Sequence, residues 1–551
     1  MQYRINEVKL KVGQSAEDIP KAILKKLGKA GRGITITDWR ITRQSVDARD
    51  KKNIFLVYGV DFDTLTGDRK LDLPTAEPRE YILPMCGEKV LSSRPVICGF
   101  GPAGMYAALI LAEAGFAPIV LERGAAMEKR IRDVEKYWHE GKLDPESNVQ
   151  FGEGGAGTFS DGKLTTNLKD PRIYKILKEF ADAGANPEIL YLHKPHIGTD
   201  VLRDVVVNIR KRIEALGGEI LFETRLEGLK TEEGRLSAAV LSSTEALKGR
   251  AEKLCKCTGE NGKRKLFEIE TDILILAPGH SARDTFRMLQ DAGVRMSPKP
   301  FSIGVRIQHS QDMINRAQYG EGWEKLGLPP AEYKLSYHCK KAEDGGKNDG
   351  RGVYTFCMCP GGEVIASASE EGTMVTNGMS YSSRDGEFAN SAVLTDVRIS
   401  DFGSSDPLAG AAFQEKYEKK AFENGGGGSQ MPRCTYGEFK KAFEERSAGC
   451  TAQNPVLDSI PDFAASAMME AMPAFGRKLR GFDSEDSILF AVESRSSSPV
   501  RIDRDEELVA CIQGLYPCGE GAGYAGGIVS AALDGIRVAE EIIKKFRPAE
   551  D

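Results

Sequence analysis

The chain has 551 residues and a net charge of −6, and 28% of its residues are charged and 41% hydrophobic. This composition is typical of a soluble globular protein, and the length is enough for about three domains of ~150 residues each. The slightly acidic balance gives no indication of a nucleic-acid partner for the chain as a whole.

The eleven cysteines are an odd number without the spacing of a disulfide framework, which favours a reducing compartment. The first residues contain no apolar signal segment, and no run approaches the ~18 apolar residues that a membrane span needs. We therefore expect a cytoplasmic protein with no membrane partner.

Residues 1–90 are predicted to form a separate small domain of βαββ order. Its first 55 residues contain thirteen Lys and Arg against six Asp and Glu, a local net charge of +7. This asymmetry is compatible with an acidic or nucleic-acid partner. We favour a second interpretation, in which the charge lies on the solvated face of a domain that packs on the rest of the chain or on a second subunit; this leaves a homo-oligomer open. The expected elements are strand 5–12, helix 16–27 and strands 33–45 and 53–61.

Residues 94–124 form a complete strand, turn, helix and strand unit around the spacing GxGxxG. Gly99 permits a tight turn, Gly101 lets a pyrophosphate approach the backbone, and Gly104 lets the helix lie close to the strand. The helix directs its N-terminal amides and the positive end of its dipole at the phosphates. The expected elements are strand 95–98, helix 102–114 and strand 117–121.

Glu122 ends the second strand of this unit, eighteen residues after Gly104. A carboxylate here accepts hydrogen bonds from an adenosine ribose, whereas an Arg would indicate a 2′-phosphate. The unit therefore predicts dinucleotide binding. The expected contacts within it are Gly99, Gly101, Pro102, Ala103, Gly104, Glu122 and Arg123.

A glycine-rich run with small hydroxyl residues lies at 148–163, after a highly charged helical segment at 125–140. Glycines let backbone amides approach a flat or phosphorylated ligand, and a plain loop of this length is uncommon. We therefore favour a cofactor contact over a flexible loop. The residues expected to make it are Gly155, Gly157, Thr158, Phe159, Ser160, Asp161, Gly162 and Lys163.

The sequence changes character at about residue 300, where alternating strands and polar loops replace the preceding pattern. Residues 424–429 read as a flexible linker within this later region. The other expected elements are helices 170–183 and 200–216, strand 219–224, a meander over 234–270 with a Lys-rich tip, strands 272–280, 302–307 and 352–357, helical sequence to about 474, and a last helix ending near 546.

The segments GFGPAG, FGEGGAGTFSDGKL, APGHSARD, MCPGGEV, TNGMS and YPCGEGAGYAGGI together resemble the family described as uncharacterised FAD-dependent, or NAD(FAD)-utilising, dehydrogenases. The similarity covers nearly the whole chain. The resemblance implies an α/β fold with a Rossmann-like FAD-binding domain of the glutathione-reductase type in two parts, residues 91–300 and 501–551. It places an inserted α+β cap or substrate domain at 301–500, beside the small N-terminal βαββ domain at 1–90.

The resemblance also implies further FAD contacts. Leu226 stands where a backbone amide and carbonyl meet the adenine, and the turn after strand 272–280 closes over FAD. Glu520 stands where an acid meets the ribitol or pyrophosphate, and the helix starting near Gly526 stabilises negative charge on the flavin. The residues concerned are Leu226, Ala277, Pro278, Gly279, Gly519, Glu520, Gly526, Gly527 and Ile528.

One departure from the glutathione-reductase pattern concerns the nicotinamide. The segment 277–281 lacks the glycine spacing of a second dinucleotide site, and no C-x4-C redox pair follows the helix after Gly104. A disulfide reductase of that type is therefore disfavoured, and any NAD(P)H is expected to dock transiently on the cap.

No catalytic base stands out. His280 follows the cofactor turn and is a candidate base, although it could equally cap the next helix. Arg495 and Asn377 are the candidate contacts on the cap side. Arg306 and His309 alternate out of a strand and could bind an anionic substrate, but an ordinary strand surface is the favoured interpretation.

The cysteines near these motifs indicate no metal site. Cys518 precedes the Gly519 turn and is expected to be a small buried residue. The pairs Cys255/Cys257 and Cys357/Cys359 have C-x-C spacing, which could supply half a zinc site, but neither has the C-x2-C spacing of a zinc ribbon. We therefore expect no metal.

Together these features predict a FAD-dependent oxidoreductase that moves a hydride between a small organic substrate and the flavin, with NAD(P)H as a candidate electron partner. Two alternatives remain: a flavin-dependent RNA-modifying protein that uses the basic N-terminal domain, and a flavin-binding protein without turnover.

Overall fold

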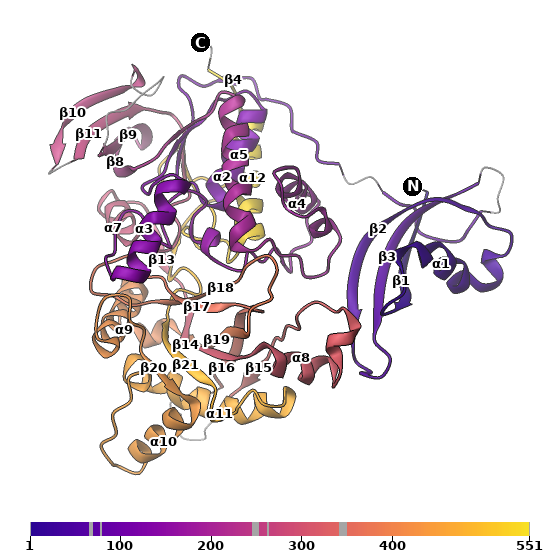
Figure 1. The fold of residues 1–551 in the computed structure, drawn as a ribbon. Coiled ribbons are helices and arrows are strands. Elements are labelled where there is room, and N and C mark those ends of the chain that lie inside the picture. The colour runs from indigo at the N-terminus through magenta and orange to yellow at the C-terminus, as the bar shows by residue number, and fades with distance from the viewer. Residues whose placement is uncertain are drawn as a thin grey trace.

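The computed structural model describes residues 2–65, 70–77, 80–244, 253–261, 264–340 and 350–549. The fold is mixed α/β, and Figure 1 shows three regions. A small N-terminal module lies to one side, a parallel sheet with helices forms the upper part of the body, and a second sheet with helices forms the lower part. We refer to the last as the cap.

The N-terminal module is a three-stranded antiparallel sheet in the order β1-β3-β2, with α1 packed against it. Alternate residues such as Val8 and Val60 point into a core that Ile23 of α1 completes, as expected for an amphipathic helix on a sheet. The predicted βαββ order is thus the observed one. The elements are β1 (Tyr3–Lys11), α1 (Ile19–Leu27), β2 (Ile36–Asp47) and β3 (Phe55–Thr64).

Part of the positive charge of this module is used internally or in docking. The buried carboxylate of Asp61 accepts from Arg4 at 2.6 Å and from Arg40 at 3.2 Å. Lys51 Nζ donates to the carbonyl oxygen of Ala317 in the cap at 2.8 Å. These contacts fit the module's packing on the rest of the chain.

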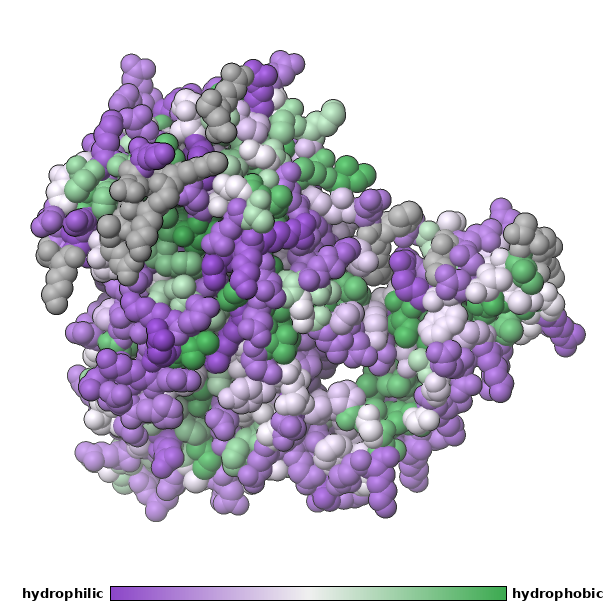
Figure 2. Space-filling model, turned by 45° about the horizontal axis from the view of Figure 1, so that its top comes forward, coloured by the Kyte–Doolittle hydropathy of each residue, from purple (hydrophilic) through white to green (hydrophobic). Residues whose placement is uncertain are grey.

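The outer edge of β2 joins the module to the body. The amide of Gln44 donates to the carbonyl oxygen of Tyr191 at 2.7 Å, and the amide of His193 donates to the carbonyl oxygen of Gln44 at 2.8 Å. This bridge covers part of an otherwise open sheet edge. Figure 2 shows the module as a separate lobe. The face of the molecule in this view is mostly hydrophilic, with apolar residues in small scattered groups.

The body contains a five-stranded parallel sheet in the order β23-β12-β5-β6-β7. β5, β6, β12 and β23 are short, buried apolar runs, as expected for a parallel sheet covered on both faces, and the edge strand β7 is half-buried. β23 comes from the C-terminal segment, so residues far apart in sequence complete one sheet. The strands are β5 (Val96–Cys98), β6 (Ile119–Leu121), β7 (Glu219–Leu221), β12 (Leu274–Leu276) and β23 (Leu515–Pro517).

Helices cover one face of this sheet and an antiparallel meander covers the other. Ile97 of β5 points toward the helices, whereas its neighbours Val96 and Cys98 point toward the meander. The helices on the first face are α2 (Pro102–Glu113), α4 (Arg172–Asp182), α5 (Thr199–Ala215) and α12 (Ile528–Lys545). The meander, in the order β10-β11-β9-β8, consists of β8 (Thr224–Glu232), β9 (Arg235–Ser243), β10 (Cys255–Asn261) and β11 (Arg264–Glu270). Most of its predicted Lys-rich tip lies outside the described residues.

The cap is built on a six-stranded sheet in the order β15-β16-β19-β14-β21-β20. Residues of α11 such as Met468 and Phe475 pack in its core. Its strands are β14 (Phe301–Ser310), β15 (Ser336–His338), β16 (Gly352–Cys359), β19 (Phe388–Val397), β20 (Arg433–Thr435) and β21 (Ile488–Glu493), with a separate pair β17 (Glu363–Ala366) and β18 (Thr376–Met379). Its helices are α8 (Gln311–Tyr319), α9 (Ala409–Gly425), α10 (Tyr436–Ser447) and α11 (Asp462–Lys478).

The two chain crossings between the cap and the body lie side by side, because β13 pairs with β22 in antiparallel fashion. Such adjacent crossings are typical of an inserted domain. The remaining elements are α3 (Met127–Glu140), α7 (Arg283–Asp291), β4 (Lys89–Val90), β13 (Met296–Pro298), β22 (Val500–Ile502), β24 (Phe546–Arg547) and the 3₁₀ turns η1 (Ala16–Asp18), η2 (Gly28–Gly31), η3 (Ala156–Phe159), η4 (Pro187–Leu190), η5 (Trp323–Leu326), η6 (Ile399–Phe402) and η7 (Leu457–Ser459).

The flexible linker predicted over 424–429 is a helix end instead. Gly425 is the last residue of α9, and Gly426 caps it in the left-handed conformation with φ of 88°. Ser429 Oγ then donates to the carbonyl oxygen of Trp138 in α3 at 3.2 Å. The glycines serve the helix C-terminus, where a left-handed residue is common, and the turn is held against the body.

Among the described residues, no helix combines the length and apolar character needed to cross a membrane.

Candidate functional site

The turn between β5 and α2 has the geometry that the glycine spacing predicts. Gly99 has φ of 99°, and a Cβ there would collide with the carbonyl oxygen of Ala277. A Cβ on Gly104 would collide with the carbonyl oxygen of Gly99, so α2 lies directly against the strand. A Cβ on Gly101 would meet only the Cα of Gly155, at 3.7 Å. The space beside Gly101 is therefore open to a ligand.

The N-termini of α2 and α12 both border this region. The N-caps are Gly101 and Gly527, and neither helix has a side-chain cap. The first amides to bond within the helices are those of Met105 and Ala531, which leaves the earlier amides for a ligand. Two uncapped helix ends concentrate positive potential in one place, which favours an anion.

The glycine-rich run links the two helix ends. Gly155 lies against Gly101, since a Cβ on Gly155 would sit 2.9 Å from the Cα of Gly101. A Cβ on Gly157 would sit 3.2 Å from the side chain of Ile528, the first residue of α12. By contrast, Gly526 has no neighbour within 4 Å of an added Cβ. Pro102, Ala103, Gly527 and Ile528 thus lie around one glycine-lined space with Gly101, Gly155 and Gly157.

Glu122 holds the turn together. Its Oε2 accepts from the amide of Phe100, and its Oε1 accepts from the amides of Gly124 and Gly152, each at 2.9 Å. An ionised carboxylate has about four acceptor positions, so Oε2 retains one for a further donor such as a ribose hydroxyl.

Two other predicted contacts have different surroundings. Arg123 makes a bidentate pair with Asp284 at 2.9 Å and contacts Glu146 at 3.1 Å, and these carboxylates raise its pKa. Leu226 is buried in the core beneath the meander. The guanidinium of Arg123 is therefore occupied by acids, and the side chain of Leu226 by packing.

Arg130 is a structural residue that the sequence did not reveal. Its fully buried guanidinium donates to the carbonyl oxygens of Asn148, Val149, Glu153 and Gly155. Burial lowers its pKa to about 10. The first half of the glycine-rich run is thus wrapped around one cation. The only sequence signal was an arginine within a highly charged helical segment.

The second half of the run docks on the cap instead of facing the glycine-lined space. Asp161 is fully buried and accepts from Arg384 Nε at 2.9 Å and from Ser380 Oγ. Lys163 Nζ donates to the carbonyl oxygen of Met358 in β16. These side chains were predicted to contact the cofactor, but their polar atoms bond to residues of the cap. Of the others, Thr158 and Phe159 are buried, Ser160 Oγ bonds within the loop to the carbonyl oxygen of Gly157, and Gly162 has φ of 67°.

His280 and Glu520 meet where β12 and β23 end. The Nδ1 of His280 lies 3.1 Å from Oε1 of Glu520, and its side chain is 10% exposed. Its Nε2 is buried and has no hydrogen-bond partner. Because a carboxylate can only accept, Nδ1 carries a proton, and in the neutral imidazole Nε2 then has the lone pair.

The glycines around this pair again leave room. A Cβ on Gly279 would meet nothing within 4 Å, whereas one on Gly521 would sit 2.6 Å from the carbonyl oxygen of Gly279. A Cβ on Gly519 would sit 2.5 Å from that of Ala103. The turns 277–279 and 519–521 are therefore packed on each other and on α2, beside open space at Gly279.

Asp534 is a further residue of the site that the sequence did not indicate. Its Oδ2 accepts from the amide of Gly519 at 2.8 Å, and both its oxygens accept from Arg504. It fixes the Gly519 turn from behind. Cys518 is fully buried beside it, and burial raises the pKa of this thiol well above its ordinary value.

Arg495 lies in a buried network and all its nitrogen atoms are engaged. It donates to Glu418 at 2.9 and 3.0 Å and to Ser369 Oγ at 2.5 Å. Glu418 also accepts from Arg283 at 2.9 Å. These two cations hold the pKa of Glu418 far below its ordinary value despite its burial. The network joins α7 of the body to α9 of the cap, which gives Arg495 a role between the two regions.

Asn377 adjoins a second buried cluster around Arg306. Arg306 is fully buried and pairs with Glu493 at 3.0 and 3.1 Å, and its Nη2 lies 3.4 Å from Oδ1 of Asn377. The interpretation of Arg306 and His309 as strand surface is therefore wrong. β18 lies over Arg306, and His309 is buried against Phe482, to whose carbonyl oxygen its Nε2 donates at 2.8 Å. Burial lowers the pKa of His309 to about 4.

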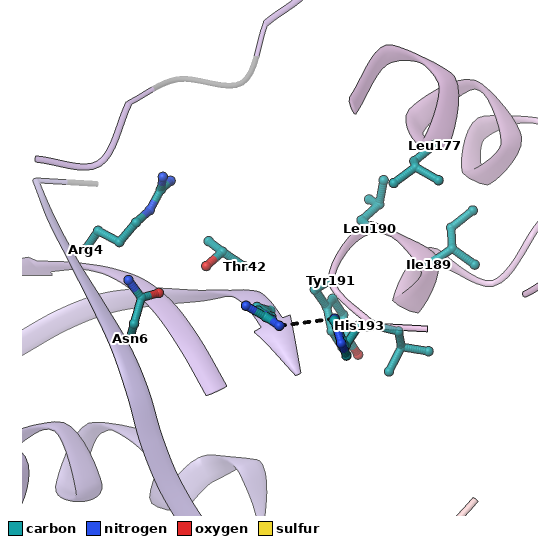
Figure 3. Close-up of a pocket in the computed structure, with 10 residues that line it drawn as sticks. Arg4, Asn6, Thr42, Leu177, Ile189, Leu190, Tyr191 and His193 are labelled. Atoms are coloured by element: carbon teal, nitrogen blue, oxygen red, sulfur yellow. Dashed lines mark hydrogen bonds between the residues drawn. The ribbon is translucent and has the colours of Figure 1, made fainter. Parts of the chain in front are cut away.

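A cavity of about 390 Å³ lies elsewhere, between the N-terminal module and the body (Figure 3). Arg43 Nη2 lies 3.2 Å from Nδ1 of His193 across it, and burial together with this cation lowers the pKa of His193. The cavity contains none of the predicted cofactor residues. It is lined by Arg4, Asn6, Thr42, Arg43, Leu177, Ile189, Leu190, Tyr191, Leu192 and His193.

Within the described residues, no group of three or more His, Cys, Asp and Glu side chains is arranged to hold a metal ion.

Comparison with known proteins places the chain in a family. A protein of Clostridium beijerinckii described as an uncharacterized protein is 43% identical over 562 residues, which cover 99% of each chain. The chain belongs to the family of this protein. In addition, residues 300–496 match the family described as "FAD-dependent protein, C-terminal domain-like", and residues 1–63 match a domain of unknown function, DUF8436. The first match spans the cap sheet from β14 to β21.

Solved structures resemble the chain only weakly. The flavin-dependent brominase Bmp2 is 13% identical, with 81% of this chain and 77% of that chain covered and a TM-score of 0.36. A glycerol-3-phosphate dehydrogenase of Bacillus halodurans, complexed with FAD, is 11% identical, with 83% and 65% covered and a TM-score of 0.34. Likenesses this weak assign no function to the chain.

Proposed function

We propose that the protein is a FAD-dependent oxidoreductase that transfers a hydride between a small organic substrate and FAD. The observation that carries the proposal is the glycine-lined space at the ends of the parallel strands. Cβ atoms added to Gly101, Gly279, Gly526 and Gly527 would contact almost no other atoms, so space is open beside these glycines. Other glycines packed between them leave no room for a side chain. Ligands of α/β proteins bind at this edge of the sheet.

The residues present fit FAD. The free amides of α2 would hold the pyrophosphate, and Oε2 of Glu122 would accept a ribose hydroxyl. The free amides of α12 would favour negative charge on the pyrimidine end of the flavin. When bound, FAD supplies a two-electron acceptor and donor. The match of the cap to a FAD-dependent family supports the same assignment.

His280 is the residue we propose as the base. Glu520 holds Nδ1–H, so Nε2 can take a proton from a substrate O–H or C–H group as the hydride leaves. Its lack of a partner in this buried position is costly in the absence of a ligand, which is typical of a group that serves a bound molecule. Asn377 and Arg495 belong to the buried clusters of the cap and would hold the surface of the cap in position.

The electron partner is tested by anaerobic titration of the FAD-loaded protein with NADH and, separately, NADPH. We expect one nucleotide to bleach the oxidised flavin bands and a panel of small carbonyl compounds to restore them. A protein that binds FAD, but whose flavin ignores both nucleotides and a panel of alcohols, amines and acids, would be a flavin-binding protein without turnover. That result would overturn the proposed activity.

A further inference from the structure

The chain contains two C-x-C pairs, and the structure gives them different surroundings. Cys255 and Cys257 lie on β10 of the meander, where Cys257 is exposed, and no cation of the described residues contacts either sulfur. Cys357 and Cys359 lie at the end of β16, with Cys359 fully buried and Cys357 half-buried. Equal spacing in the sequence therefore corresponds to two unlike sites.

The backbone of β16 departs from a regular strand at Cys357. In the pairing with β19, Phe356 faces Ala392 and Cys359 faces Asn390, so two residues oppose one. Cys357 has φ of 44°, a left-handed conformation that is strained for a residue with a Cβ. Bulges of this kind re-aim side chains and occur beside functional sites.

The bulge brings the side chain of Cys359 to the backbone of Cys357. In a regular strand, residues two apart are separated by about 6.6 Å, near the upper limit of about 6.8 Å between the Cα atoms of a disulfide. Here Cys359 folds back, and its Sγ lies 3.3 Å from the carbonyl oxygen of Cys357. Gly378 of β18 makes room for it, because a Cβ there would sit 2.9 Å from this sulfur.

Two cations face the pair. Arg306 Nη1 lies 4.0 Å from Sγ of Cys359 and donates to the carbonyl oxygen of Cys357 at 3.2 Å. Lys163 reaches the same bulge through the carbonyl oxygen of Met358. A hydrogen bond from Cys359, with these cations, lowers the pKa of Cys357, while that of Cys359 is raised. A cysteine with a lowered pKa beside a second thiol is the arrangement of a reactive dithiol.

The pair also lies at the end of the loop that borders the glycine-lined space. The run passes Gly101 at Gly155, passes the start of α12 at Gly157, and reaches β16 through Lys163. A change at the cysteines is therefore connected by a short continuous segment to the proposed FAD site.

We propose that Cys357 and Cys359 form a redox-active dithiol that exchanges two electrons with FAD, so that this enzyme has a second redox centre in the cap. Starting from the Cys357 thiolate and the Cys359 thiol, an S–S bond forms and the S–H bond of Cys359 breaks. Two electrons and one proton leave the pair, and their acceptor is oxidised FAD. The reverse reaction opens the disulfide. The electron exchange rests on the proposed FAD-dependent function, but disulfide formation does not.

Disulfide formation is tested by trapping. The protein is equilibrated anaerobically in glutathione buffers of graded potential, quenched in acid and alkylated with a maleimide. Its peptides are then analysed by mass spectrometry. We expect the peptide with Cys357 and Cys359 to lose both labels together as the buffer becomes more oxidising. The peptide with Cys255 and Cys257 should keep its labels over the same range. If the first pair stays labelled, or both pairs respond alike, the dithiol is disproved.

Electron exchange is tested by anaerobic dithionite titration of the oxidised, FAD-loaded protein. We expect the wild type and the control variant Cys255→Ser/Cys257→Ser to take up about four electrons per flavin, and Cys357→Ser about two, since each couple takes two. A count of about two in the wild type would overturn the exchange. A chain that binds no FAD would overturn the proposed function, while trapping would still decide the dithiol.

Discussion

His280 Nδ1 lies 3.1 Å from Glu520 Oε1, and this contact joins the ends of two neighbouring parallel strands, β12 and β23. Each residue follows a glycine turn that packs on the other. The pair therefore lies at the strand ends, with one imidazole nitrogen held and the other free.

Replacing Glu520 tests whether this pairing positions a base. Glu520→Ala removes the acceptor, so the imidazole can rotate, and we expect the rate of flavin reduction at saturating donor to fall about 100-fold. Glu520→Gln keeps an acceptor oxygen and should lose less than about tenfold. Stopped-flow absorbance measures both rates. Equal rates in the wild type and Glu520→Ala would contradict a positioning role.

Gly101→Val is expected to abolish FAD binding without unfolding the chain. An added Cβ at Gly101 meets only Gly155, so the protein can accommodate it, but the branched side chain fills the space of the pyrophosphate. The flavin retained after gel filtration and the Tm measure the two effects. Gly259→Val in β10, where a Cβ meets nothing within 4 Å, is the matched control and should retain FAD. Full flavin content in Gly101→Val would contradict the placement of the site.

His309 should make stability depend on pH between about 6.5 and 4. Burial lowers its folded pKa to about 4 from 6.5, so the folded state favours the neutral ring. The neutral ring therefore stabilises the folded state fully above the unfolded pKa of 6.5. This contribution is lost as the pH falls through the folded pKa of about 4. The shift corresponds to about 3 kcal/mol. Gln can donate to the same carbonyl, so His309→Gln should remove this loss. Urea unfolding at pH 7 and pH 4 measures it, and identical losses in both proteins would argue against the burial effect.

Glu418→Gln should destabilise the contact between the body and the cap. The change removes the buried carboxylate that Arg283 and Arg495 share and leaves them only the partly exposed Glu370, and breaking such a buried pair costs about 3–5 kcal/mol. Glu415→Gln, on the same helix, removes partly exposed pairs with Lys419 and with Arg287 of α7, and should cost less than about 1 kcal/mol. Urea unfolding midpoints compare the two variants, and equal midpoints would contradict the network.

Gln44→Pro tests the docking of the N-terminal module. The Gln44 amide points away from its own sheet toward Tyr191, so proline removes this one of the two bridging hydrogen bonds while leaving β2 intact. We expect the amides of residues 187–193 to exchange hydrogen several-fold faster. Gln44→Ala keeps the backbone donor and should exchange like the wild type. Unchanged exchange in Gln44→Pro would mean that other contacts hold the module.

Local patterns predicted the elements that are set locally. The expected helix over 102–114 is observed at Pro102–Glu113, since the glycine turn, proline and apolar run all lie within a few residues. The four elements of the N-terminal module follow for the same reason. The expected linker at 424–429 shows the limit, because glycines mark both flexible chain and a helix C-terminus.

The side chains of the site depended on partners distant in sequence. Arg130 and Arg306 look like surface charges in a helix and a strand, but the glycine-rich run and β18 bury them. Asp161 and Lys163 belong to a cofactor-type loop, yet the cap takes their polar atoms. Likewise, nothing in the spacing of the two C-x-C pairs distinguishes the one that lies beside Arg306.

The central claim is that the glycine-lined space holds FAD. The most direct test is the visible absorbance spectrum of the purified protein after incubation with FAD and gel filtration, with mass analysis of the nucleotide released by denaturation. We predict that oxidised flavin bands remain with the protein and that the released nucleotide is FAD. A folded protein that emerges without flavin would contradict the account.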